Sequence, residues 1–427
     1  MSRKILKNFS SLIMAQLIYK LCTFVMMILI ARFLRPDAFG RLSYGLSFVW
    51  AFLFLSDFGL SELFIRDVSR ERQLQGKYVN NIITLKILIG LISYLVIILT
   101  AWRLSVDIEK SWIIMILGAS VILDSFMYFF RCLFRVKETM EYEGLLMIIE
   151  ALLKLGVILL AIKSEINISR VILISFALLV VSILNFIVNL ISFCLKNKTF
   201  SFSIDKVFWP YLLKTGFPFA FVYILSLLNF RIDIIMLSLM KGDEAAGWYS
   251  ANYKLLEQLI LIPITLSAVY LPVFSRLSDT FGKLHTIFIR TVPFLLLLGI
   301  SLIAIINFFK IDIIRIVYGK EFESASQYIF ILSWVLIPYF FKPIVEKLLY
   351  ALGKQATLCF IYSSGILGNI ILNIILIPRW GINGASFATF IFETLIVLSC
   401  IILYLRFYKI YSVQYKIERT LTESEIF

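Results

Sequence analysis

Long apolar runs alternate with short polar connections along the whole chain. Twelve such runs are present, and each is long enough to cross a bilayer, since a helical span needs about 20 apolar residues. The runs lie near 9–34, 40–64, 79–101, 112–134, 144–162, 170–195, 216–240, 246–273, 286–309, 326–350, 355–378 and 382–405. The pattern predicts an all-α polytopic membrane protein with twelve transmembrane helices and no inserted soluble domain.

The second half of the chain resembles the first. The turn RPDAFG at 35–40 matches KGDEAAG at 241–247 with one residue inserted. Further on, Ser69-Arg70 matches Ser275-Arg276 and Gly76-Lys77 matches Gly282-Lys283, both at an offset of 206. An internal duplication of this kind is common in secondary transporters, which bind substrate between their halves. We therefore predict two six-helix lobes, 1–200 and 201–405, related by a parallel repeat.

Composition and charge agree with a membrane protein. The chain is 61% hydrophobic with mean hydropathy +0.94, which excludes an ordinary soluble globular protein. A net charge of +14 would suggest nucleic acid in a soluble chain, but here the positive-inside rule accounts for it and we expect no nucleic-acid partner. With twelve helices, 23 of the 41 Lys and Arg residues fall on the side of the two termini and 12 on the other. Both termini are thus predicted to be cytoplasmic, with residues 406–427 as a cytoplasmic tail that begins as a short interfacial segment and frays into disorder.

Cysteine and histidine offer no metal or redox chemistry. The five cysteines are widely spaced within or beside apolar runs and form no CxxC pair. The single histidine, His285, falls in a predicted connecting loop. We predict no disulfide, no metal and no cofactor.

Six basic residues lie inside the predicted helices, where each costs about 2.5–3.5 kcal/mol unless its charge is compensated. They are Lys20, Lys86, Lys154, Arg231, Lys254 and Lys342. Helical spacing predicts pairing of three of them within their own helices, as Glu150–Lys154, Lys254–Glu257 and Lys342–Glu346. Lys86 is near enough to a helix end to snorkel to the cytoplasmic face.

Lys20 and Arg231 have no acidic residue at pairing distance in their own helices, and these two helices correspond in the repeat. One interpretation is a water-filled cationic cavity that binds an anion, for which arginine in particular suits phosphate. The other is that both form salt bridges to acidic residues of neighbouring helices. The candidate partners are Asp57, Asp124, Asp233 and Glu393, which are also candidates to bind a coupling proton or cation.

Four stretches resemble a known family. They are ARFLRPDAFGRLSYGLSFV (31–49), LSDFGL (55–60), RIDIIMLSLMKGDEAAGWYSANYKLLEQLILIP (231–263) and NIILNIILIPRWGINGASFATFIFE (369–393). Over nearly its whole length the chain is similar to the Wzx-type polysaccharide biosynthesis flippases. These are the O-antigen repeat-unit exporters of the multidrug/oligosaccharidyl-lipid/polysaccharide exporter superfamily.

The resemblance implies a two-lobed, non-enzymatic flippase of the bacterial inner membrane that works by alternating access. Its cargo would be an undecaprenyl-pyrophosphate-linked glycan, and its further partners membrane lipid, a polysaccharide polymerase and a chain-length regulator. The anion hypothesis then becomes a pyrophosphate site at Lys20 and Arg231, with Lys86 and Lys254 as further candidates. The main alternative is a cation-coupled drug antiporter of the same superfamily, whose site is typically acidic or aromatic.

Overall fold

The computed structural model describes residues 3–104, 107–196, 201–276, 281–352 and 354–424. Nearly all of these residues are helical, and this part of the chain contains no strand. All twelve predicted apolar runs lie in helices, which confirms the all-α polytopic fold class. Among the described residues, eight helices qualify as membrane spans by length and composition, or nine if one bent pair counts as a single span. One of the eight, Leu12–Arg70, combines the first two predicted runs.

The chain divides into two compact units, Met1–Gly247 and Trp248–Phe427. Helix α8 packs with unit 1, on α1, α2 and α3, although it lies beyond residue 200. The lobe boundary at 200/201 remains a prediction. The elements of unit 1 are α1 (Arg3–Ala51), α2 (Leu53–Asp57), α3 (Leu60–Arg70), η1 (Arg72–Leu74), α4 (Gln75–Leu104), α5 (Ile108–Val136), α6 (Met140–Lys163), α7 (Arg170–Lys196), α8 (Phe208–Lys241) and the start of α9 (Asp243–Leu259).

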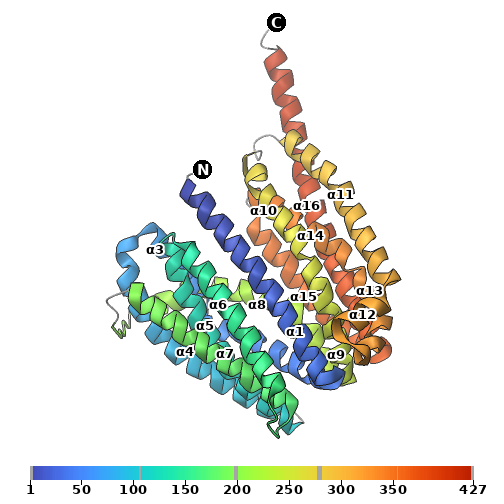
Figure 1. Ribbon diagram of the computed structural model, residues 1–427. Coiled ribbons are helices and arrows are strands. Elements are labelled where there is room, and N and C mark those ends of the chain that lie inside the picture. The colour runs from blue at the N-terminus through green and yellow to red at the C-terminus, as the bar shows by residue number, and fades with distance from the viewer. Residues whose placement is uncertain (1–2, 105–106, 197–200, 277–280, 353, 425–427) are drawn as a thin grey trace. The chain divides into compact units, whose positions relative to one another are not determined.

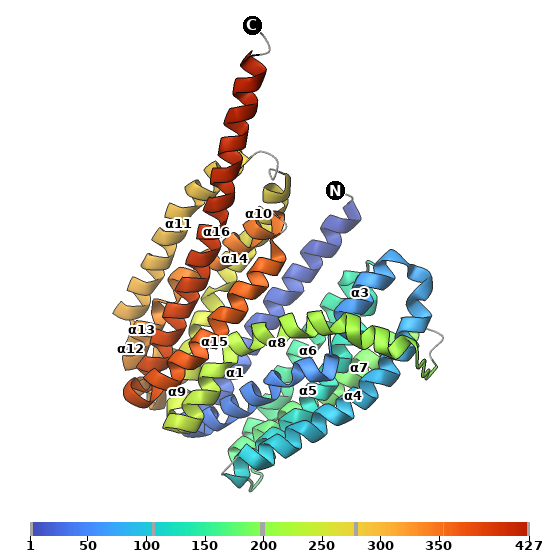
Figure 2. The ribbon, with the colours of Figure 1, turned by 180° about the vertical axis from the view of Figure 1, so that it is seen from behind.

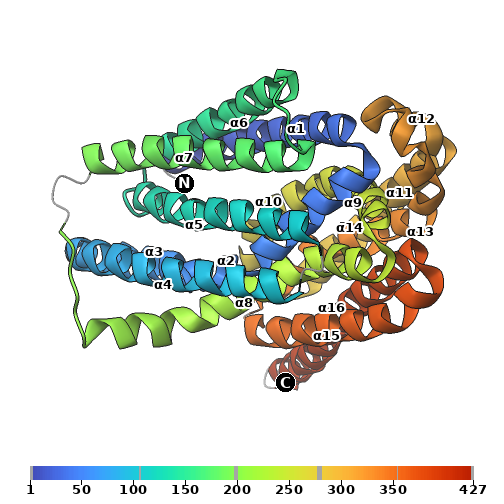
Figure 3. The same ribbon diagram turned by 90° about the horizontal axis from the view of Figure 1, so that it is seen from below.

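Helix α5 is the centre of unit 1, because α4 and α7 both pack along it and α1 and α3 contact it as well. Figures 1 and 3 show α4, α5 and α7 side by side. Phenylalanines fill the space between these helices, and the Phe64 and Phe129 rings meet edge to face at 5.2 Å. Such pairs add to the stabilisation that burial of their apolar area already provides.

Two breaks interrupt the helical backbone within the first 60 residues of the chain. Helix α1 changes direction at Arg35, which has φ 67° and ψ 166° and is followed by Pro36. The second break separates α2 from α3 at Phe58 (φ 50°) and Gly59 (φ 72°), both in the left-handed region. A left-handed residue stops the regular hydrogen-bond ladder and leaves the preceding side chains at a helix end.

Unit 2 is built from the rest of α9 and the elements that follow. They are α10 (Leu261–Arg276), α11 (Phe281–Phe308), α12 (Lys310–Tyr318), η2 (Lys320–Tyr328), α13 (Ile329–Ser333), α14 (Leu336–Ala351), α15 (Gln355–Trp380) and α16 (Ile382–Ser424). Helix α15 lies along α16, and α14 packs on both α10 and α16 (Figure 2).

Two smaller predictions in unit 2 were wrong. The tail after residue 405 does not fray, because α16 continues as helix to Ser424; residues 425–427 lie outside the described residues. His285 is not in a loop but in the first turns of α11, where its Nδ1 lies 3.2 Å from the Tyr404 hydroxyl.

Candidate transport site

A cavity of about 260 Å³ lies within unit 1 between α2, α3, α5 and α8. Three carboxylates line it, from Asp57, Glu62 and Asp124. The remaining lining residues are Leu53, Phe54, Gly59, Ser125, Tyr128, Phe219 and Ala220. The cavity therefore combines hydrogen-bond acceptors, two hydroxyl groups and aromatic faces in one space.

Asp57 is held at the end of α2 by the left-handed break that follows it. Its carboxylate accepts a hydrogen bond from the Ser61 hydroxyl and an ion-paired one from Lys86 Nζ at 2.5 Å. Lys86 is 0% exposed and also donates to Ser125 Oγ at 2.7 Å. Lys86 thus does not snorkel to the membrane surface as predicted, because Asp57 compensates its charge inside the protein.

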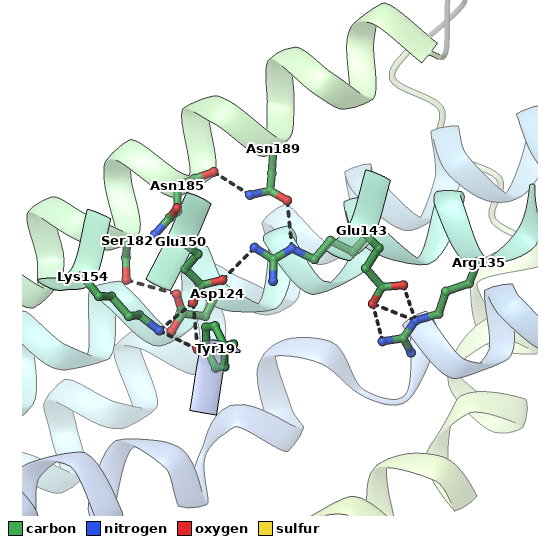
Figure 4. A network of polar contacts seen from close by, with 10 residues as sticks. Tyr19, Asp124, Arg135, Glu143, Glu150, Lys154, Ser182, Asn185 and Asn189 are labelled. Carbon is green, nitrogen blue, oxygen red and sulfur yellow. Dashed lines mark hydrogen bonds and ion pairs between the residues drawn. The ribbon is translucent and has the colours of Figure 1, made fainter. Parts of the chain in front are cut away.

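Glu62 lines the same cavity from the first turn of α3. It accepts a hydrogen bond from the hydroxyl of Tyr128, which in turn accepts from Arg135 Nη1 at 3.2 Å. Arg135 is fixed by Glu143, which receives three hydrogen bonds of 2.6–3.0 Å from its guanidinium. The Arg135–Glu143 pair, visible in Figure 4, anchors the end of α5 to the start of α6.

Behind the cavity, a buried polar network joins α1, α5, α6 and α7 (Figure 4). Glu150 is its centre, since its carboxylate accepts from Tyr19 at 2.9 Å, Arg131 at 2.7 Å and Lys154 at 2.6 Å. The predicted Glu150–Lys154 pair is confirmed. Lys154 also donates to the Tyr19 hydroxyl at 2.7 Å, which closes a three-membered ring of contacts. A buried carboxylate is stable only with such compensation.

Helix α7 completes the network with polar residues on one face. Arg131 Nε donates to Asn189 Oδ1 at 3.0 Å, and Asn189 Nδ2 donates to the backbone carbonyl of Asn185 at 2.8 Å. Ser182 Oγ donates to Asp124 at 3.0 Å. Asp124 therefore belongs to both the polar network and the cavity, because it also lines the cavity.

The predicted pyrophosphate candidates do not gather at this cavity. Its lining residues include none of Lys20, Arg231, Lys86 or Lys254. Lys20 is exposed, and Arg231 lies over the Trp50 ring at 4.8 Å. Lys254, which belongs to unit 2, forms the predicted pair with Glu257 at 3.6 Å. Asp233, the acidic neighbour of Arg231, is buried.

Unit 2 contains a smaller buried ion pair. Lys342 on α14 contacts Glu393 on α16 at 2.9 Å and lies 4.8 Å from the Tyr362 ring centre. The predicted Lys342–Glu346 pair is wrong, because Glu346 instead accepts a hydrogen bond from the Tyr362 hydroxyl. The less favourable order of a cation preceding an acid by four residues left Lys342 open to a partner from another helix.

Sequence reasoning missed several members of the network. The sequence prediction assigns no role to Arg131, Tyr19, Ser182 or Asn189. A signal was present, because Asp124 and Arg131 are seven residues apart and therefore share one face of a helix. Ser182, Asn185 and Asn189 have the same kind of spacing on α7.

Comparison with protein-family models shows to which family the chain belongs. The model described as "Polysaccharide biosynthesis protein" matches residues 5–278, more than half of the chain. The chain belongs to the polysaccharide biosynthesis protein family. A second model, described as MatE, matches residues 218–375. A search of curated protein sequences found no match.

Solved structures support the same fold for this family member. A lipid II flippase, MurJ, in an inward closed conformation has a TM-score of 0.75 at 19% identity, over 92% of this chain and 86% of that one. An inward-facing multidrug MATE transporter has a TM-score of 0.72 at 14% identity, over 92% and 94% of the two chains. A MATE transporter from Vibrio cholerae has a TM-score of 0.60 at 13% identity, over 95% and 98%. The polysaccharide biosynthesis family member thus has the same fold as these solved flippase and transporter structures.

Proposed function

We propose that this chain is a flippase that moves undecaprenyl-pyrophosphate-linked oligosaccharide repeat units from the cytoplasmic to the periplasmic leaflet by alternating access. The family match over residues 5–278 carries the proposal, because this segment contains every residue of the cavity. One solved structure with the same fold is the lipid II flippase MurJ. The proposed cargo serves O-antigen or another surface polysaccharide.

The cavity suits the glycan part of such a cargo better than its pyrophosphate. Sugar hydroxyls donate hydrogen bonds to carboxylates, and sugar rings pack on aromatic faces such as Phe54 and Phe219. An anionic pyrophosphate is repelled by the same carboxylates. We keep Lys20 and Arg231, with Lys254, as the proposed pyrophosphate ligands, and assign Lys86 to the neutralisation of Asp57.

An export assay tests the proposal. In a bacterium that lacks its own repeat-unit flippase, this chain should restore surface glycan and reduce the lipid-linked intermediate that accumulates inside. Arg231→Ala should abolish export and Lys20→Arg should keep more export than Lys20→Ala, because charge is the property required at position 20 and bidentate geometry at 231. The exposed Lys163→Ala is the matched control and should export normally.

Two results would contradict these assignments. Normal export by both alanine variants would remove the pyrophosphate role, and failure of Arg231→Ala to accumulate in the membrane would make Arg231 structural.

A second function also has support, since three carboxylates and two phenylalanines in the cavity are the composition expected of an organic-cation antiporter. Efflux of organic cations without glycan export would favour that function.

A further inference from the structure

The two turns that correspond in the internal repeat have the same backbone conformation. Arg35 has φ 67° and ψ 166°, and Gly242 has φ 91° and ψ 172°. Each turn is followed five residues later by a glycine, Gly40 or Gly247. The repeat is therefore in register at an offset of 207 through both turns, and the one-residue change to an offset of 206 falls between Gly40 and Ser69.

These two turns cross each other within unit 1 through their glycines. A Cβ on Gly40 would overlap the backbone carbonyl of Asp243, and a Cβ on Gly247 would overlap the backbone carbonyl of Pro36. Because Pro36 and Asp243 are themselves equivalent in the repeat, the contact is reciprocal, as about a local twofold axis. Only glycine permits so close an approach of two backbones.

The first turn of α5 ties both sides of this crossing together. Glu109 accepts a hydrogen bond from Arg41, which follows Gly40. The next residue, Lys110, contacts Asp243 at 2.6 Å and donates to Ser238 Oγ at 3.2 Å. Lys110 and Asp243 are each only 14% exposed, so the pair is shielded from water and from salt.

A second close glycine contact lies beside the cavity, where α8 meets the break between α2 and α3. A Cβ on Gly216 of α8 would lie 2.7 Å from the Phe58 carbonyl, and a Cβ on Gly59 would overlap the Gly216 carbonyl. Gly59 itself lines the cavity. The chain segments before residue 200 and after it therefore touch backbone to backbone at two places. Phe219 and Ala220 of the cavity lining lie between these two places along the chain.

We propose that the Gly40–Gly247 crossing and the ion pairs Arg41–Glu109 and Lys110–Asp243 form a latch. This latch closes the cavity toward the side opposite the two predicted cytoplasmic termini, which we call the odd-loop side because the first, third and every later odd-numbered connection between the predicted helices lies there. This inference rests on the proposed flippase function, because alternating access requires the two predicted lobes to separate on that side. The Lys110–Asp243 pair is the bond that must break, since it joins the first lobe to the second. The Arg41–Glu109 pair lies within the first lobe and is kept.

The latch is tested by labelling a cysteine in the cavity. In a chain whose five native cysteines are replaced, Phe219→Cys lines the cavity and reacts with a membrane-impermeant maleimide only when the cavity is open to that side. Ile168→Cys, in the exposed connection between α6 and α7, marks the odd-loop side. Labelling is compared in vesicles of both orientations for the parent, Lys110→Asp, Asp243→Lys and the double charge swap.

Each single variant places like charges together and should raise labelling from the odd-loop side about fivefold, the population change that about 1 kcal/mol produces. The double swap Lys110→Asp with Asp243→Lys restores the attraction and should return labelling to the parent value. Glu323→Lys, which breaks the exposed Arg315–Glu323 pair, is the matched control and should change nothing.

Unchanged labelling in the single variants, or high labelling that the swap does not reverse, would overturn the latch. If Lys110→Asp fails to accumulate, Asp243→Asn removes the attraction without adding repulsion and is judged by the same labelling. The assay requires no substrate, so it separates the two ideas. A latch that follows these rules in a chain without glycan export would leave the latch standing and remove the proposed cargo.

Discussion

Unit 1 and unit 2 each bury cations and carboxylates, but they compensate them differently. In unit 1, one connected network surrounds Glu150, which accepts from two cations and a tyrosine. In unit 2, Lys342 and Glu393 form an ion pair, and Glu346 accepts a hydrogen bond from the nearby Tyr362. The charged residues of both clusters lie in the fourth to sixth predicted runs of each half, and Tyr19 of unit 1 lies in the first run. Duplication has therefore kept the place of the buried charge and not the residues that carry it.

Because the buried charges form a network in unit 1 and an ion pair in unit 2, removal of one carboxylate should lower the unfolding free energy by different amounts in the two units. Removal of one member of a shared network leaves several buried groups without compensation, whereas removal of one member of a pair leaves only one. In unit 2, the remaining lysine would still lie near two aromatic rings, Tyr339 and Tyr362. Cation–π attraction partly compensates such a charge.

The largest effect is expected at Glu150. Glu150→Gln keeps the shape but removes the charge that Arg131 and Lys154 share, so the variant should lose about 3–5 kcal/mol of unfolding free energy. Thermal unfolding in detergent, compared with the parent, measures this loss. The exposed Glu165→Gln is the control for loss of a carboxylate charge alone. A Glu150→Gln protein as stable as that control would show that the network contributes nothing.

A smaller effect is expected in unit 2. Glu393→Gln should lose about 1–3 kcal/mol, because Lys342 keeps its aromatic neighbours. The double variant Lys342→Met with Glu393→Gln should recover most of that loss, since replacing both members of a buried pair is often nearly neutral. The same unfolding assay measures both. If Glu393→Gln cost as much as Glu150→Gln, the contrast between network and pair would be wrong.

The fold was largely predictable from the sequence, because long apolar runs in a bilayer must form helices. Pairing within one helix was also predictable, as Glu150–Lys154 and Lys254–Glu257 show. Pairing between helices was not, since it depends on packing. Glu393 reaches Lys342 from another helix, and no spacing rule along the chain connects them.

The cavity could not be predicted for the same reason. Its walls depend on the left-handed break at Phe58 and Gly59 and on how α8 packs against it. The sequence placed Asp57 and Asp124 among the intramembrane acids without showing that they face one space. Lys86 was predicted to snorkel to the membrane surface, because its partner Asp57 lies 29 residues away on another helix and no spacing rule connects the two.

The smallest loss of stability is expected at the partly exposed Lys77–Asp205 pair. This pair tests whether burial is the reason why the Glu150 network and the Lys342–Glu393 pair contribute to the unfolding free energy. Asp205 contacts Lys77 at 3.3 Å and accepts hydrogen bonds from the backbone N–H groups of Phe208 and Val207 at the start of α8. The N–H group of Phe208 has the largest effect, followed by that of Val207 and by Lys77, and together they hold the pKa of Asp205 below its usual value.

A carboxyl whose pKa is lowered in the folded protein stabilises the fold at pH values above its unfolded pKa of about 3.9. That contribution is lost as the pH falls through the folded pKa. Asp205→Asn should therefore lower the unfolding temperature slightly at neutral pH, less than Glu393→Gln does, and the difference from the parent should shrink below about pH 4. Parallel unfolding curves of the two proteins across this range measure it, and a difference that stays constant with pH would mean that the Asp205 charge has no part in it.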